Sequence, residues 1–316
     1  MNILVTGGLG FIGHEVVKLL QHEHTVTVVD SLTNYDFIPS DQLKQLITQR
    51  IQQLSCAFIE GDIRDKQFID DIITNSNTNV VIHLASFPRQ KVVLENPSVA
   101  SEVMSTGLIN LLEASKGTVS KFVYVSSSMV YGDFDDMVTE KHACNPRGQY
   151  AIMKYMGEKL VEDYKKHFDY TIVRPSAVYG PRDVEDRVLS KFVLGALQDE
   201  VLKVRGTTEV LDFTYSTDTA QGIALAATKT CKYDIYNITR CENKPITLAH
   251  AATTVIELAG KGSWLEYAKD PNFPSRGRLD TTRAIRDLGF TATVDFEQGC
   301  QLYVDWMKAN DTIYRS

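Results

Sequence analysis

A glycine-rich segment near the amino terminus constrains the fold of this chain more than any other feature. Residues 3–6 are predicted to form a buried strand, and Thr6-Gly7-Gly8-Leu9-Gly10-Phe11-Ile12-Gly13 leads from that strand into a segment of helical periodicity. Glycines at this spacing permit a tight turn, close approach of the backbone to a pyrophosphate, and close packing of helix on strand. The first N–H groups of the helix then face the phosphates. The motif therefore predicts a dinucleotide site built on Gly7, Gly10 and Gly13.

The segments that follow alternate between short apolar runs and longer runs of helical periodicity. The predicted strands cover residues 3–6, 25–29, 57–59, 80–84, 122–125 and 170–173, and the predicted helices cover 11–22, 66–74, 97–115 and 149–167. Strands that are apolar on both faces and joined by helices form parallel sheets covered on both sides. This alternation predicts an α/β fold with a doubly wound parallel sheet, the Rossmann architecture.

Beyond residue 176 this alternation breaks down. Prolines and glycines interrupt shorter elements there, so we expect a dinucleotide-binding domain over residues 1–175 and a smaller C-terminal substrate lobe over 176–316. Residues 212–228 are expected to return to the first domain. A Gln-rich insertion at 40–54, with Leu43, Leu46 and Arg50 at helical spacing, is either an extra surface helix or a lid or interface element.

Composition excludes several classes of protein. The net charge of −7 argues against binding to nucleic acid through bulk charge. The five cysteines are scattered without a CxxC pair, which predicts free thiols in a reducing compartment and no metal site. No apolar stretch approaches the roughly 20 residues of a membrane span. The N-terminus lacks the basic segment of a signal peptide, so we expect a cytoplasmic protein that does not bind a membrane.

Two aspartates refine the prediction for the cofactor. Asp30 ends the second predicted strand, where a carboxylate accepts hydrogen bonds from the adenosine ribose and repels a 2′-phosphate, which favours NAD over NADP. Asp62 follows the third strand and is a candidate for contact with the adenine amino group. For each aspartate, the capping of a turn is the alternative interpretation.

Tyr150 and Lys154 are candidate catalytic residues because they are separated by one helical turn and share a helix face. An ammonium beside a phenol lowers the phenol's pKa and makes the tyrosine a usable general base. Tyr155 and Lys159 have the same spacing but apolar neighbours, so we assign Tyr155 to packing. Ser127 ends the fifth predicted strand, at the sheet edge where such folds bind ligands, and its hydroxyl can share the proton that Tyr150 handles.

These motifs occur in a characteristic order together with Leu84-Ala85-Ser86, Ser126-Ser127-Ser128 and Arg174-Pro175-x-x-Val178-Tyr179-Gly180-Pro181. As a set they resemble the extended short-chain dehydrogenase/reductases, specifically the NAD-dependent nucleotide-sugar epimerases and dehydratases, and most of all the UDP-glucose 4-epimerases. The resemblance implies that Tyr150 is the base and acid, that Lys154 holds the nicotinamide ribose and Tyr150, and that Ser127 is the hydroxyl partner. It also implies NAD contacts at Gly7, Gly10, Phe11, Ile12, Gly13, Asp30, Ser31, Asp62, Ile63, Leu84, Ala85, Ser86, Tyr150, Lys154, Pro175 and Val178.

The same resemblance implies a nucleoside-diphosphate sugar as substrate. Arg187 and Arg276 would face the diphosphate, since a guanidinium binds phosphate through two parallel hydrogen bonds. Ser128 and Arg89 would line the sugar pocket, although Arg89 is equally compatible with a solvated loop. The 4,6-dehydratases of the family carry an Asp-Glu pair where this chain has Ser128 and Met129, which argues against dehydration. Ala177 and Leu211 replace an Asn and an Arg that are usual in epimerases, so the sequence does not predict the identity or the pose of the sugar.

The expected reaction is therefore epimerisation at C4 through a transient 4-keto sugar. Another oxidation, reduction, decarboxylation or dehydration of a nucleotide sugar is the alternative, and an NAD-binding regulator without turnover is a remote one. We also expect a homodimer, by analogy and because two helices carry more apolar side chains than one sheet face requires. These side chains are Val99, Val103, Leu108, Leu111, Leu112, Ile152, Met156, Leu160 and Tyr164.

Overall fold

The central element of the fold is a parallel β-sheet. The structure is a computed structural model, and it describes residues 1–33, 35, 38–184, 186–271 and 273–314. Within these residues, seven strands form the sheet in the order β10-β6-β5-β4-β1-β2-β3, with every neighbouring pair parallel. Their bounds are β1 Asn2–Thr6, β2 Thr25–Asp30, β3 Ala57–Glu60, β4 Val80–His83, β5 Lys121–Val125, β6 Asp169–Pro175 and β10 Ile235–Ile238.

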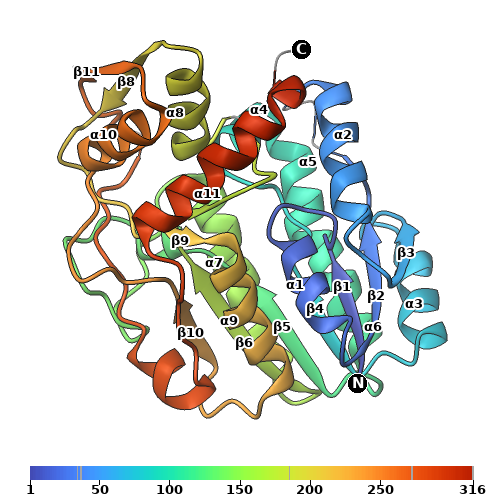
Figure 1. The fold of residues 1–316 in the computed structure, drawn as a ribbon. Coiled ribbons are helices and arrows are strands. Elements are labelled where there is room, and N and C mark those ends of the chain that lie inside the picture. The colour runs from blue at the N-terminus through green and yellow to red at the C-terminus, as the bar shows by residue number, and fades with distance from the viewer. Residues whose placement is uncertain (34, 36–37, 185, 272, 315–316) are drawn as a thin grey trace.

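Helices cover both faces of this sheet, as the sequence predicted (Figure 1). Side chains alternate along each strand, so Ile3 and Val5 pack towards α1 (Gly13–Leu20) and α9 (Ser216–Thr228), whereas Leu4 packs on the opposite face. That opposite face is covered by α3 (Lys66–Asn75), α6 (Leu108–Ser115) and α7 (Gln149–Asp163). The two apolar layers enclose the sheet and leave the carboxyl ends of its strands for the site.

Three details of this domain differ from the prediction. The helix expected over 97–115 consists of α5 (Pro97–Ser101), a π-helical turn over Glu102–Gly107 and α6, and the helix expected to reach residue 167 ends at Asp163. Strand β10 was not predicted, because its four residues follow a break in the alternating pattern. It pairs with β6, so part of the chain beyond residue 176 belongs to the sheet. Helix α9, which lies in the 212–228 segment expected to return to the first domain, packs against α1.

The rest of the C-terminal half forms a separate apolar core. Phe192, Phe213, Ala251 and Phe296 are buried in it. This core is built from α8 (Val188–Leu197), α10 (Leu248–Ala259), α11 (Phe296–Ala309) and two small parallel pairs, β8 (Val201–Arg205) with β11 (Ser263–Tyr267) and β7 (Val178–Tyr179) with β9 (Thr214–Tyr215). Shorter elements complete the fold: α4 (Gln90–Glu95), 3-10 turns over Ser128–Tyr131 and Asp311–Tyr314, and a π-helical turn over Ala284–Leu288.

The 40–54 insertion forms α2 (Ser40–Ile51), which lies beside the C-terminal end of the chain (Figure 1). The sequence left open a surface helix and a lid or interface element, and α2 has features of both: Asp41, Lys44 and Gln45 on it are exposed, whereas another face of it is buried. Gln42, Leu46 and Arg50 are at most 4% exposed, and Leu46 packs in the core of the C-terminal half together with Ile38. The helix therefore connects the two halves of the molecule.

None of the described helices has the length and apolar character needed to cross a bilayer. All five cysteines are unpaired, as predicted. Among the described residues, no group of three or more His, Cys, Asp or Glu side chains is arranged to hold a metal ion.

Candidate dinucleotide and sugar site

The glycine-rich loop joins β1 to α1 in a conformation that requires glycine. Gly7 has φ of +72°, in the left-handed region, and a Cβ added there would lie 2.6 Å from the Ala85 nitrogen. A Cβ at Gly13 would lie 2.1 Å from the Gly7 carbonyl oxygen. Gly7 N–H donates to the Val29 carbonyl at 2.8 Å and Gly10 N–H donates to the Gly7 carbonyl at 3.0 Å. The loop thus holds the backbone of Phe11 and Ile12 at the start of α1, where a phosphate can approach it.

Asp30 lies at the end of β2 and already holds part of this loop. Its Oδ2 accepts a hydrogen bond from Leu9 N–H at 2.9 Å, and its Oδ1 accepts from Leu32 N–H at 3.0 Å. Burial raises the pKa of this carboxyl above its usual value, against the opposing effect of these hydrogen bonds and of the Arg50 charge. The Gly10 backbone also hydrogen-bonds this carboxylate, which, with about four acceptor sites, keeps one for a ribose hydroxyl. Asp30 therefore holds the turn, as one interpretation expected, and its contact with the ribose stays a prediction.

Asp62 lines a separate cavity of about 350 Å³ together with Ser31, Tyr35 and Arg64. The Arg64 side chain hydrogen-bonds both carboxylate oxygens of Asp62, at 2.7 to 3.1 Å. Burial alone would raise the pKa of Asp62, but the Arg64 guanidinium holds it below its usual value. The cavity lies beyond the ends of β2 and β3, which is where the adenosine end of a dinucleotide is expected in this fold.

The remaining predicted cofactor residues lie at three places: the loop after β4, the segment after β3, and the end of β6 with the following β7. Ala85 packs directly on Gly7, while Leu84 and Ala85 donate their N–H groups to the Thr6 carbonyl, and Ser86 follows in the same loop. Ile63 is buried in the sheet core, and its contact with NAD stays a prediction. Pro175 ends β6, and Val178 lines the larger cavity described next.

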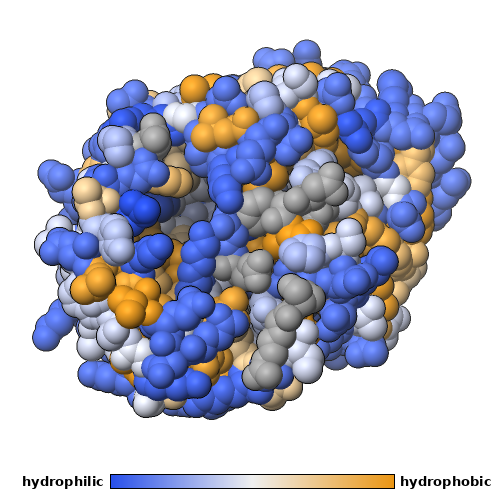
Figure 2. Space-filling view, turned by 90° about the horizontal axis from the view of Figure 1, so that it is seen from above, coloured by the Kyte–Doolittle hydropathy of each residue, from blue (hydrophilic) through white to orange (hydrophobic). Residues whose placement is uncertain are grey.

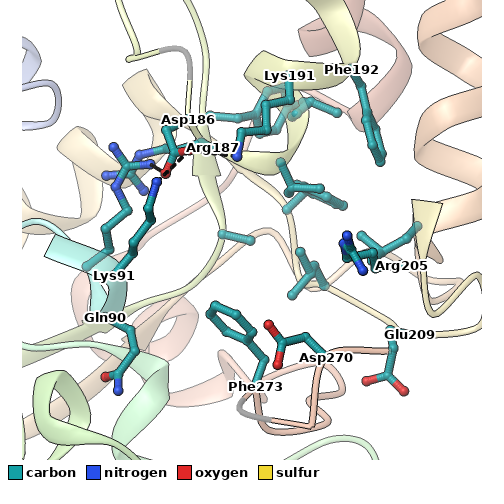
Figure 3. Close-up of a pocket in the computed structure, with 18 of the residues that line it drawn as sticks. Gln90, Lys91, Asp186, Arg187, Lys191, Phe192, Arg205, Glu209, Asp270 and Phe273 are labelled. Atoms are coloured by element: carbon teal, nitrogen blue, oxygen red, sulfur yellow. Dashed lines mark hydrogen bonds and ion pairs between the residues drawn. The ribbon is translucent and has the colours of Figure 1, made fainter. Parts of the chain in front are cut away.

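That larger cavity has a volume of about 960 Å³ and brings together residues far apart in the sequence, among them Arg89, Ser127, Ser128, Tyr150, Arg187 and Arg276. Figure 3 shows Lys91 and Arg187 beside Asp186 at one end, with Arg205, Glu209 and Asp270 at the other. Seen from above the strand ends, this face of the molecule is hollowed and bordered mostly by hydrophilic side chains (Figure 2). The size and the cationic lining suit an anionic ligand larger than a free sugar.

Tyr150 is the second residue of α7 and contributes its phenol to this cavity. Its N–H donates to Gln90 Oε1 at 3.0 Å, and its hydroxyl interacts with that of Ser127. Burial raises the pKa of Tyr150, and the charges of Arg187, Arg276 and Arg89, with the Ser127 hydroxyl, oppose that rise. Arg187 in turn ion-pairs with Asp183 at 3.0 Å, Arg89 with Asp186 at 3.3 Å, and Arg276 Nη1 donates to Ser128 Oγ at 3.5 Å.

Lys154 lies one helical turn after Tyr150 on α7 and is buried. Its ammonium donates to the Val125 carbonyl at 2.8 Å and lies over the Tyr124 ring, 5.4 Å from the centroid. Burial lowers the pKa of Lys154 to about 7, against the raising effect of Glu158. The charges that oppose the raised pKa of Tyr150 in the structure are those of Arg187, Arg276 and Arg89, and the effect of Lys154 on the phenol stays a prediction. Tyr155, by contrast, packs in a small apolar cluster, in agreement with its assignment.

Two groups of site residues were missed from the sequence. Gln90 holds the backbone at the start of α7 and lines the cavity. Glu158 lies one helical turn beyond Lys154 and forms a buried ion pair with Arg174 at 2.5 Å, while Ser126 Oγ donates to Glu158 at 2.5 Å. The four-residue spacing of Lys154 and Glu158 was a usable signal for the second group. No local pattern identified Gln90.

Comparisons with known proteins define the class. The sequence pattern of the family described as "NAD dependent epimerase/dehydratase family" matches residues 3–239. A UDP-glucuronate 4-epimerase of Thermodesulfobacterium geofontis is 30% identical over 99% of this chain and 98% of its own length, and a dTDP-D-glucose 4,6-dehydratase of Bos taurus is 28% identical over 98% and 89%. The crystal structure of the Thermotoga maritima UDP-glucose 4-epimerase with UDP-glucose has a TM-score of 0.86 and 27% identity, covering 98% of this chain and 99% of that one.

The chain belongs to the NAD-dependent epimerase/dehydratase family. It has the fold of that family over its whole length and depends, as its relatives do, on NAD. The residues present fit this cofactor. Gly7 and Gly13 leave the close approach that a pyrophosphate needs, Asp30 retains an acceptor site for a ribose, and a cavity opens beside Ser31 and Asp62.

Proposed function

We propose that this protein epimerises a nucleoside-diphosphate sugar at C4 through a transient 4-keto sugar. The observation that carries the proposal is the position of the Tyr150 phenol, which interacts with Ser127 and with three guanidinium groups at the wall of the 960 Å³ cavity. A phenol surrounded by fixed positive charge is a proton acceptor whose charged form is stabilised in advance.

In this proposal Tyr150 removes the proton of the C4 hydroxyl and later returns it, with Ser127 sharing the hydrogen bond. NAD, held by the glycine-rich loop and Asp30, would supply the hydride acceptor for C4 and, in its reduced form, the hydride donor, so that no net redox change results. Arg187, Arg276 and Arg89 stabilise the phenolate. Lys154, held by the Val125 carbonyl, is assigned to the nicotinamide ribose. Gly7, Gly10, Phe11, Ile12 and Gly13 hold the pyrophosphate.

Ser128, Arg89, Arg187 and Arg276 are proposed to bind the substrate. The lining supports a ligand of net negative charge, since burial lowers the pKa of Arg89 and Arg276 only to about 10 and both remain cationic at neutral pH. The cavity is long enough for the cations at its two ends to contact different parts of the ligand (Figure 3). We place the sugar beside Tyr150 and Ser128, with the nucleotide extending into the C-terminal half, residues 176–316.

Dehydration is the second candidate within the family, because dehydratases are also among the relatives. It requires an acid and a base besides Tyr150 to remove water from the sugar. Ser128 hydrogen-bonds Ser176 at 3.1 Å and Met129 carries no ionisable group. These side chains favour epimerisation over dehydration.

We also propose a cytoplasmic homodimer that associates through α6 and α7. Fewer apolar side chains are available to a partner than the sequence predicted, because Val103, Leu108, Leu111 and Leu112 pack in the subunit's own core. Ile109 and Ile152 remain 38% and 53% exposed on these two helices and supply apolar surface for a partner. Light scattering at micromolar concentration tests this, and a monomer mass contradicts it.

The proposed function is tested by a panel of UDP-, GDP-, CDP- and dTDP-sugars, ranked by thermal shift and then incubated with the NAD-loaded protein. Proton NMR should detect a C4 epimer of unchanged mass for at least one sugar. A product that has lost water, or stoichiometric NADH, assigns the site to the alternatives.

A further inference from the structure

We infer that Arg50, on the inserted helix α2, is a positioning residue that fixes the dinucleotide loop and ties it to the segment that carries Arg187. The inference rests on the proposed function for its consequence in catalysis, but the loop geometry and NAD binding can be tested without turnover.

The first contact is with the loop itself. Arg50 Nη1 donates to the Leu9 carbonyl at 2.8 Å, and Leu9 N–H donates to Asp30 Oδ2 at 2.9 Å. Both backbone polar groups of Leu9, which lies between Gly8 and Gly10, are therefore held by charged side chains. A glycine-rich loop is otherwise conformationally permissive, so this pair of contacts fixes the orientation of the peptides that precede the pyrophosphate-binding turn.

The second contact reaches the other half of the molecule. Arg50 Nη2 donates to the Arg182 carbonyl at 2.6 Å, and Arg182 has φ of +67°, a constrained backbone position. The next residue, Asp183, is fully buried and ion-pairs with Arg187 at 3.0 Å. Arg187 in turn lies 5.6 Å from the centroid of the Phe11 ring, so the chain of contacts returns to the dinucleotide loop.

Helix α2 is anchored well enough for Arg50 to act in this way. Leu46, one helical turn before Arg50, is fully buried in the core of the C-terminal half, and Gln49 Nε2 donates to Asn310 Oδ1 at 2.8 Å. Arginine suits the task, because its planar fork presents separate donors to two carbonyl groups, whereas a lysine ammonium is a point charge on a flexible stem. Burial lowers the pKa of Arg50 to about 10, against the raising effect of Asp183 and Asp30, so the group stays charged at neutral pH.

The test compares Arg50→Met and Arg50→Lys with Gln49→Ala in protein stripped of NAD. Gln49→Ala loosens the same helix but leaves both carbonyl contacts of Arg50 intact, so it is the matched control. NAD affinity is measured by calorimetric titration, and the Tm without NAD reports folding. We expect Arg50→Met to weaken NAD binding by about 10- to 100-fold, Arg50→Lys to weaken it by a smaller factor, and Gln49→Ala to stay within about twofold.

If Arg50 only stabilised the fold, a different pattern would result. In all three variants, the loss of NAD affinity would then follow the loss of stability, measured as the decrease in Tm. The inference is overturned if Arg50→Met binds NAD within about twofold of the unaltered protein, or if Gln49→Ala weakens binding equally. If Arg50→Met fails to fold, the test uses Arg50→Lys, which keeps the charge but lacks the two fixed donors of the guanidinium. An unchanged NAD affinity of Arg50→Lys then overturns the inference. A protein that binds NAD but epimerises no sugar removes the proposed function and leaves this test valid.

Discussion

The ammonium of Lys154 donates to the carbonyl of Val125, 2.8 Å away at the end of β5, and this contact accounts for how a buried lysine is held beside a sheet edge. It also gives the site a titration that can be measured. The pKa of Lys154 is lowered by burial to about 7, so between that value and the roughly 10.4 of an unfolded chain the unfolded state binds more protons.

The first prediction concerns the pH dependence of stability. Because the unfolded state binds more protons in that window, Lys154 makes the folded protein relatively less stable at or below pH 7 and progressively more stable towards pH 10. In NAD-free protein, Lys154→Met should therefore raise Tm relative to the unaltered chain at pH 6–7, and this advantage should shrink as the pH rises. Calorimetry at pH 6, 7, 8 and 9 measures it, and a constant difference across the series would show that Lys154 titrates normally.

The second prediction concerns the arginine that acts most strongly on the phenol. Arg187 opposes the burial that raises the pKa of Tyr150, so Arg187→Met should move the rising limb of log(kcat/KM) against pH to higher pH, by about one unit. The pH–rate profile is the measurement. Lys191→Met is the control: Lys191 also lies on the cavity wall, but its ammonium is paired with Asp186 at 2.6 Å, so this change should leave the limb in place.

The third prediction addresses the buried pair of Glu158 and Arg174, both side chains being 2% exposed. Glu158→Gln leaves the guanidinium without its counter-charge, which costs about 3–5 kcal/mol of unfolding free energy. The double variant Glu158→Gln/Arg174→Met should recover part of that loss, since no buried charge remains. Urea unfolding decides between this outcome and simple additivity of the two single changes.

The fourth prediction concerns cofactor choice. Asp30→Asn removes the charge that would repel a 2′-phosphate but retains an acceptor for Leu9 N–H, so the preference for NAD over NADP should fall about tenfold while the fold persists. Titration of both cofactors into both proteins measures the ratio. An unchanged ratio would mean that Asp30 acts only on the loop.

The parts of the candidate site whose local geometry could be predicted from the sequence are those whose signal is local. Gly7 and Gly13 follow a strand within a few residues, and the four-residue spacing of Tyr150 and Lys154 expresses a shared helix face. The positive charge around the Tyr150 phenol had no local signal in the sequence. It comes from Arg89, Arg187 and Arg276, which belong to three separate segments, and only the fold brings them to Tyr150. The contact that holds Lys154 was not predicted for the same reason, because the Val125 carbonyl belongs to β5.

Two elements of the fold were missed or misjudged on similar grounds. Strand β10 has four residues and no glycine signal, and its place is set by pairing with β6. Helix α2 is Gln-rich, which favours a surface assignment, yet Leu46 and Arg50 are buried because the C-terminal half supplies the surface that covers them. Tertiary packing overrides composition at such positions.

The central claim is that the Tyr150 phenol exchanges the C4 hydroxyl proton of a nucleotide sugar without net redox change. The most direct measurement is proton NMR of the H4 signal in the sugar selected by the substrate panel, for the NAD-loaded protein and for Tyr150→Phe, with NAD retention checked in both. The account predicts a C4 epimer of unchanged mass from the first protein, and a rate at least about 100-fold lower from Tyr150→Phe at equal NAD content. Full epimerisation by Tyr150→Phe, or a product altered at any carbon other than C4, would contradict it.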